Sequence, residues 1–301
     1  MHHHKWRFIL SALIIPVALY VIFVVSPYGQ AVWIAMTDWG GYSASWNFVG
    51  LDNFARVLRD PDFLRALGHN VIMLVVCPVL IILLGLFLAT MITFGGSGRS
   101  GNRAVTGVRG AGFYRIVYFF PSVLSIAVIA VMWQAVFEPR NGLLNGFLSA
   151  VGLGWLRQIW LGDPRTSLAS VIAVMVWVSA GFYVVLFTAA MASIPTEIIE
   201  AALIDGANRW ATFWRIVLPL VWSPVQTAII FLIIGALDGF AVVQILTNGG
   251  PDNSSTVMAL YMYDTAFKSS NFGYASAIGV TLLVITLVLT TVTLRLTRRE
   301  V

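Results

Sequence analysis

Charged residues and cysteine are both scarce in this chain. Only 10% of its 301 residues are charged, against about 25% in an ordinary soluble domain. The single cysteine, Cys77, lies in an apolar stretch, so the sequence offers no disulfide framework and no thiolate metal site. His69 is the one histidine outside His2–His4, a cluster directly after Met1 that looks like part of a purification tag.

Nucleotide-binding motifs are missing as well. The glycine-rich stretch 95–101 lacks the lysine and the Ser/Thr of a phosphate-binding loop, and no Walker A pattern occurs elsewhere. Any ATP hydrolysis that drives this protein must therefore take place on another polypeptide. We expect no cofactor and no metal on this chain, and we expect that it is not an enzyme.

Long apolar runs take up most of the sequence. The chain is 59% hydrophobic and its mean hydropathy is +0.87. A helix needs about 20 apolar residues to cross a bilayer, and six stretches qualify: 8–36, 71–94, 116–137, 168–192, 216–237 and 274–296. The sequence therefore predicts an all-α membrane protein, with a short tail over residues 1–7 and one six-helix transmembrane domain over residues 8–301.

Prolines within these stretches predict interrupted or kinked helices, which packed membrane helices tolerate. The prolines concerned are Pro16, Pro78, Pro121, Pro219 and Pro224. Kinks of this kind suit helices that surround a cavity, although ordinary kinking without function explains them equally well.

The basic residues predict the orientation of the chain. An even number of spans places both termini on one side, and with that side inside the cell 11 of the 18 Lys and Arg residues lie in inner segments. We therefore expect cytoplasmic termini in a multi-pass protein of a bacterial or archaeal plasma (inner) membrane. The pI near 9.6 reflects this topology, so we expect no nucleic-acid partner.

The inner segment 193–215 has helix start and stop signals. Thr196 is placed to cap a short helix, and Gly206 suits a left-handed exit from it. A second helix is predicted to begin near Asn208 and to run into the fifth span. The residues by themselves leave two interpretations open: a compact turn between helices, or a small surface on which another protein docks.

The same segment resembles the "EAA" loop of binding-protein-dependent ABC importer permeases. The matching residues are Glu200-Ala201-Ala202, then Gly206 after three residues, then Ile216-Val-Leu-Pro219 after nine more. The resemblance implies a type I importer permease fold and a coupling helix that docks on an ATP-binding subunit. It implies coupling roles for Glu200, Ala201, Ala202, Asp205, Gly206 and Pro219.

Three further stretches resemble the maltose-type carbohydrate branch of that family. They are 48–54 (FVGLDNF), 119–124 (FFPSVL) with 142–145 (GLLN), and 246–251 (LTNGGP) with Asn253, Ser254 and Tyr261. The last stretch is similar to the MalF-like first permease of a pair. The resemblance implies sugar import with a second, MalG-like permease, a dimer of ATP-binding subunits that hold ATP and Mg, and an extracytoplasmic solute-binding protein.

Candidate residues for the solute path lie on the fourth and fifth spans, since sugars bind through aromatic faces and polar groups. They are Trp177, Ser179, Gly181, Tyr183, Asp238 and Gln244. Packing against lipid or neighbouring helices accounts for each aromatic residue equally well. The outer loops 37–69, 138–167 and 247–273 are long enough to dock a binding protein, while Trp39, Tyr42, Trp46 and Trp160 also suit the lipid surface.

Other functions remain open at this point. The same architecture could import glycerol-phosphate or an amino-sugar. An ATP-independent secondary transporter would favour inverted repeats or intramembrane charge relays, and the sequence has neither. An intramembrane enzyme lacks support, because no Ser/His pair or His/Glu cluster can be placed in the spans.

Overall fold

The protein is helical throughout the part of the chain that the structure describes. The computed structural model describes residues 12–96, 107–236 and 239–297. Within these ranges no strand longer than an isolated bridge residue occurs, and Thr37 pairs with Phe48 in one such bridge. The predicted all-α class is confirmed, while the tail 1–7, the cluster His2–His4 and the candidate Asp238 lie outside the described residues.

The helices follow one another along the chain with short connections. They are η1 (Val21–Val25), α2 (Ser26–Ala35), α3 (Asp52–Val57), α4 (Pro61–Phe94), α5 (Ala111–Val123), α6 (Ile126–Val136), α7 (Leu143–Ala150), η2 (Gly154–Leu156), α8 (Ser167–Ala192), α9 (Thr196–Ile204), α10 (Arg209–Thr212), η3 (Phe213–Val217), α11 (Leu218–Leu220), α12 (Trp222–Ala236), α13 (Phe240–Leu246), α14 (Met258–Tyr263), η4 (Asp264–Lys268) and α15 (Phe272–Thr297).

Four helical stretches are long and apolar enough to cross a membrane without a break. They are Ala12–Ala35, Pro61–Phe94, Ser167–Ala192 and Phe272–Thr293. The predicted third and fifth spans are instead bent pairs: α5 and α6 meet at 99°, and the segment Arg209–Leu220 meets α12 at 71°. The described residues therefore contain four helices that are long and apolar enough to span a membrane, or up to six candidate spans if each bent pair counts as one.

The prolines act unequally on these helices. Pro121 and Pro219 each lie within three residues of a break, as the predicted kinks require. Pro78 lies inside α4, which continues over 34 residues, so the predicted interruption there is wrong. Pro224 lies in the first turn of α12, where a missing N–H breaks no hydrogen bond within the helix.

The chain divides into two compact units. Unit 1 comprises residues 1–65 and 258–288. In this unit Asn53 donates to the carbonyl oxygens of Ala35 and Thr37 at 2.9 and 2.8 Å. The N–H of Gly273 donates to the carbonyl oxygen of Trp39 at 2.9 Å. These bonds attach the first outer loop to the end of α2 and to the start of α15.

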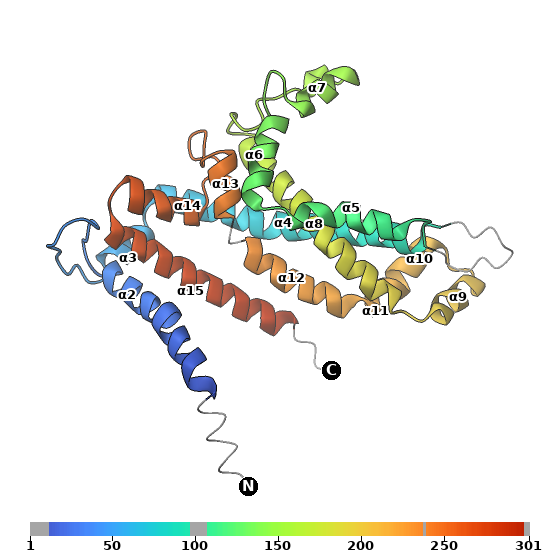
Figure 1. Cartoon of the computed structure of the whole chain (residues 1–301), viewed down its shortest axis with the longest axis horizontal. Coiled ribbons are helices and arrows are strands. Elements are labelled where there is room, and N and C mark those ends of the chain that lie inside the picture. The colour runs from blue at the N-terminus through green and yellow to red at the C-terminus, as the bar shows by residue number, and fades with distance from the viewer. Residues whose placement is uncertain (1–11, 97–106, 237–238, 298–301) are drawn as a thin grey trace, which may run out of the picture. The chain divides into compact units, whose positions relative to one another are not determined.

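Unit 2 comprises residues 66–257 and 289–301. Its buried side chains come from α4, α6 and α8, and Ile81, Ile129 and Phe187 are among the largest of them. Within this unit α5 runs beside α8, and α6 turns out of that direction toward α7 (Figure 1). The first half of α4 is attached to the segment before α14, since His69 Nδ1 lies 2.8 Å from the carbonyl oxygen of Thr256.

Candidate functional site

The predicted coupling segment is a short helix with a defined C-terminal stop. Helix α9 ends at Ile204, Asp205 is its C-cap, and Gly206 follows in the left-handed region at φ +83°. The N–H of Ala207 donates to Ala202 O, and the N–H of Gly206 donates to Leu203 O. This pair of bonds is a Schellman motif, which satisfies carbonyls that the helix end would leave free. The predicted left-handed exit at Gly206 is confirmed.

The start of α9 differs from the prediction. Thr196 is the first residue of the helix and Pro195 precedes it, without a side-chain cap. The predicted cap by Thr196 is therefore wrong. One helix later the predicted start at Asn208 is confirmed, because its side chain accepts a hydrogen bond from the N–H of Ala211 at 2.8 Å. The N-cap residue of α9 is a proline, whose side chain has no oxygen to accept a hydrogen bond from the first turn, whereas α10 has an asparagine N-cap.

An exposed surface surrounds the glycine break. Ala201, Asp205 and Gly206 are exposed, and no neighbouring heavy atom lies within 4 Å of a Cβ placed on Gly206. Ile204 is 86% exposed, so an apolar side chain stands at the tip of the segment. Ala202 instead faces inward as a buried residue.

The other predicted coupling residues flank this tip. Glu200 is half-buried, and Pro219 is exposed in α11. Trp210 is 70% exposed and packs edge-on against Trp214, with ring centroids 5.5 Å apart. Small, charged and aromatic groups are thus exposed along α9, α10 and the segment that follows.

The solute-path candidates on α8 separate into exposed and packed residues. Trp177 is 38% exposed and Ser179 is half-buried, so both have surface available to a ligand. Gly181 is buried, and a Cβ placed there would lie 1.8 Å from the carbonyl oxygen of Tyr118 in α5. Tyr183 is also buried, with its ring against Phe187. Gln244 is half-buried on α13.

Aromatic rings follow one another from Trp177 toward the outer loop. Trp133 of α6 lies 5.4 Å from Trp177 between ring centroids, with the planes at 75°. Phe137 lies 5.1 Å from Trp133, and Trp160 lies 6.3 Å from Phe137. We call these four residues the aromatic row. They join the predicted solute path on α8 to the loop between α7 and α8.

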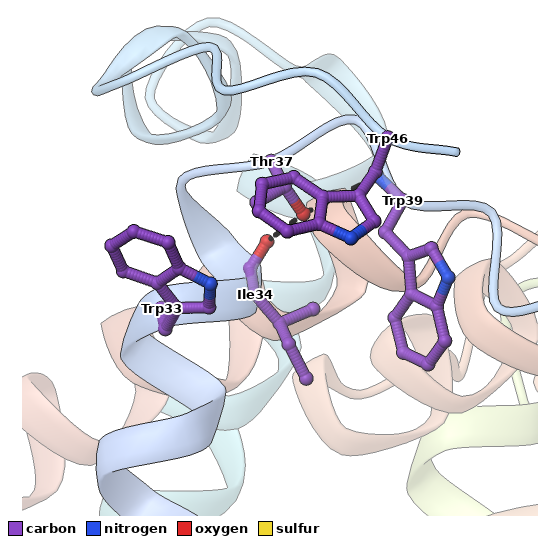
Figure 2. Close-up of a pocket in the computed structure, with 5 residues that line it drawn as sticks. All are labelled: Trp33, Ile34, Thr37, Trp39 and Trp46. Atoms are coloured by element: carbon purple, nitrogen blue, oxygen red, sulfur yellow. Dashed lines mark hydrogen bonds between the residues drawn. The ribbon is translucent and has the colours of Figure 1, made fainter. Parts of the chain in front are cut away.

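A second aromatic site lies in unit 1, at the end of the first span. A pocket of about 200 Å³ is lined by Trp33, Ile34, Thr37, Trp39 and Trp46 (Figure 2). The Thr37 hydroxyl already donates to the carbonyl oxygen of Ile34 at 2.8 Å. The pocket therefore presents ring surface with little free hydrogen-bonding capacity, which suits an apolar group better than a hydroxyl-rich sugar.

Asp60 anchors the outer loop of unit 1. Its Oδ2 accepts hydrogen bonds from the hydroxyls of Tyr261 and Tyr274, at 2.6 and 2.5 Å. Burial raises the pKa of the Asp60 carboxyl, but these bonds and the N–H groups of Asp62 and Phe63 outweigh it and hold the pKa below its usual value. A charged Asp60 thus ties the start of α4 to α14 and α15.

Comparison with known proteins now decides the family. Residues 81–300 match the family described as "binding-protein-dependent transport system inner membrane component". The chain belongs to this family. It is a membrane permease.

Individual relatives agree over nearly the whole chain. The permease is 44% identical over 283 residues to the diacetylchitobiose uptake system permease protein NgcF of Streptomyces coelicolor, covering 93% of this chain and 79% of that protein. It is 31% identical over 289 residues to the sn-glycerol-3-phosphate transport system permease protein UgpA of Agrobacterium fabrum, covering 95% and 92%.

A solved structure shares the fold. It is a chain of a bacterial ABC transporter involved in the import of the acidic polysaccharide alginate, with a TM-score of 0.79 at 23% identity. The alignment covers 99% of this permease and 96% of that chain. The expected type I importer permease fold is confirmed.

Sequence reasoning missed Trp133 and Trp160 as neighbours of the solute path. Trp177 and Trp133 lie 44 positions apart on different helices, so no spacing rule connects them. The available signal was compositional, since three of the four members of the aromatic row are tryptophans. Only the fold, which brings the Trp133 ring of α6 against the Trp177 ring of α8, turns that composition into a contact.

Proposed function

We propose that this permease moves a neutral sugar, such as a disaccharide or a longer oligosaccharide, into the cell. The solute would arrive from an extracytoplasmic solute-binding protein, and ATP hydrolysis on separate subunits would drive its import. The supporting relative of highest identity reported above is a permease for diacetylchitobiose uptake. The location that follows is a bacterial or archaeal plasma membrane, with both termini in the cytoplasm.

The absence of basic side chains on the proposed path is the observation that carries this choice. Helices α8, α12 and α13 contain no Lys or Arg. A phosphate dianion on such a path would lack a counter-charge from this chain, at a cost of several kcal/mol in a low-dielectric site. A neutral sugar needs only ring faces and hydroxyl partners, which Trp177, Ser179 and Gln244 can offer.

Coupling to ATP would use the exposed surface around Gly206. The Schellman turn fixes the direction in which α9 ends, and Asp205 and Ala201 lie exposed beside it. A partner ATP-binding subunit could seat this tip in a groove, with Ile204 as the apolar contact. Motion of the partner would then reach α12 through α10, η3 and α11, which connect to one another without a loop.

The first span supports the proposal of a second, MalG-like permease. The first long helix, Ala12–Ala35, contains an apolar stretch of 18 residues, and no residue of that stretch is buried by the rest of the chain. Side chains such as Phe23 and Trp33 project from it with more than half of their surface exposed. A second permease would cover part of this helix, lipid would cover the rest, and a dimer of ATP-binding subunits holding ATP and Mg would complete the importer.

Uptake by the reconstituted importer tests this function. The permease, its partner permease, the ATP-binding subunits and the binding protein are placed in proteoliposomes and offered labelled diacetylchitobiose, maltose, an amino-sugar or sn-glycerol-3-phosphate. We expect ATP-dependent uptake of a neutral sugar and none with an ATPase-inactive partner. Uptake that persists without ATP would refute the coupled importer.

Glycerol-phosphate is the alternative cargo, because some relatives of this chain are named as permeases of sn-glycerol-3-phosphate transport systems. It requires that the second permease supply the basic groups that α8, α12 and α13 lack. The same uptake assay decides between the two, since preferential uptake of sn-glycerol-3-phosphate would overturn the neutral-sugar assignment while leaving the importer class intact.

A further inference from the structure

The aromatic row has a fixed outer end. Asn145 of α7 is 2% exposed, and its Nδ2 donates to the carbonyl oxygens of Pro139 and Gln158 at 3.0 and 2.9 Å. Its Oδ1 accepts from Trp160 Nε1 at 2.8 Å. A buried amide with its donors and acceptor all in use holds one orientation, so the plane of the Trp160 ring is set by the outer loop.

The row is also attached to α8 at that end. The carbonyl oxygen of Trp160 accepts hydrogen bonds from Thr166 Oγ1 at 2.9 Å and from Ser170 Oγ at 3.1 Å. Trp177 follows Ser170 by two helical turns, or about 10 Å along the axis. The aromatic row therefore contacts α8 at both of its ends: near the first turn of α8 through Trp160, and two turns later at Trp177.

The middle of the row is packed on both sides at Phe137. Phe137 is 4% exposed and stacks at a tilt of 37° to 38° against Trp133 on one side and Trp160 on the other. The neighbouring side chain of Gln134 donates to the carbonyl oxygen of Ile245, which ties α6 to the end of α13. The Trp133 ring is held by packing against Phe137 and against its edge-to-face partner Trp177, which is partly open, and its indole N–H has no hydrogen-bond partner among the described residues.

We propose that Trp133 is a positioning residue for the solute path: it fixes the indole of Trp177, and Asn145 sets that position from the outer loop through Trp160 and Phe137. This inference rests on the proposed function, in which Trp177 contacts the sugar. A tryptophan held in one orientation before binding loses less side-chain entropy when the sugar stacks on it. Trp133 would therefore tune which sugar is carried, without touching the coupling loop.

Four variants separate positioning from bulk packing. Trp133→Leu removes the ring, whereas Trp133→Phe keeps an aromatic ring against Trp177. Trp160→Phe keeps an aromatic ring at position 160 but removes the indole N–H that donates a hydrogen bond to Asn145 Oδ1. Trp155→Phe is the matched control, because Trp155 lies in the same loop and is 76% exposed.

In the assembled importer we expect Trp133→Leu to raise the apparent KM for sugar uptake about threefold to tenfold, the range that an aromatic pair is worth. Stimulation of ATPase activity by the binding protein should persist. The apparent KM of Trp133→Phe should stay within about twofold of the parent value. Trp160→Phe should also raise the apparent KM, but by less than Trp133→Leu does, and Trp155→Phe should leave it unchanged. An unchanged KM in Trp133→Leu, or an equal loss in Trp133→Phe, overturns the proposal.

The relay is tested by combining variants. If Trp160 acts through Trp133, then Trp160→Phe should have no further effect in the Trp133→Leu background, whereas independent roles would add. Near-ultraviolet circular dichroism of the purified importer supplies a readout without transport, since the Trp133–Trp177 pair contributes to it. A Trp160→Phe spectrum that differs from the parent only by the loss of one indole contradicts positioning even if the cargo proves not to be a sugar.

Discussion

At the scale of single residues, Gly181 was predicted to line the solute path, but in the structure it packs against a neighbouring helix. Because the space that its Cβ would occupy holds the backbone oxygen of Tyr118, Gly181→Ala should force α5 and α8 apart. We expect a loss of roughly 1–3 kcal/mol of stability, visible as a lower Tm of the purified permease. Gly235→Ala is the control, since nothing lies within 4 Å of that position; equal melting of the two variants would contradict this role.

Asp60 gives a prediction about acid stability. Its carboxyl has a pKa below the unfolded value, so the stability it contributes is present above the unfolded pKa and is lost as pH falls through the folded pKa. We expect the parent to lose stability below about pH 4 more steeply than Asp60→Asn does. Thermal unfolding from neutral to acidic pH measures this, and Asp62→Asn should retain the parental slope because Asp62 is exposed.

At the scale of elements, the break between α9 and α10 decides how the coupling loop is presented. Gly206→Leu combines a left-handed strain of about 1–2 kcal/mol with a bulky group on the exposed tip. We expect uptake to fall strongly while ATPase activity persists. Gly206→Asn tolerates the same backbone region, so it should lose less. Normal uptake by an assembled Gly206→Leu importer would show that the tip does not dock closely.

At the scale of the whole molecule, the unburied first span predicts dependence on a second permease. Expressed alone and solubilised in detergent, the permease should aggregate or associate through this helix. Co-expressed with its partner permease it should elute as a defined complex. Size-exclusion chromatography with light scattering measures this, and a monodisperse permease that ignores the partner would contradict the assignment.

The structure also shows why hydropathy predicted the positions of the spans better than their shape. Hydropathy reports where about 20 apolar residues occur, and the six stretches overlap the four long helices and the two bent pairs, although α4 begins at Pro61, ten residues before the predicted start. It carries no information on direction. Pro121 precedes a 99° turn, whereas Pro78 remains inside a continuous helix, because neighbouring helices decide whether a proline bends or is absorbed.

Sequence by itself determined the class of protein, the coupling motif and the left-handed turn at Gly206. Each is a local property: apolar length, residue spacing, and the freedom of a residue without a Cβ. Tertiary structure decided which candidates are exposed and which are packed. Gly181 and Trp177 are four residues apart on one helix, yet one is pressed against Tyr118 and the other is open, since burial depends on what a neighbouring helix brings to that face.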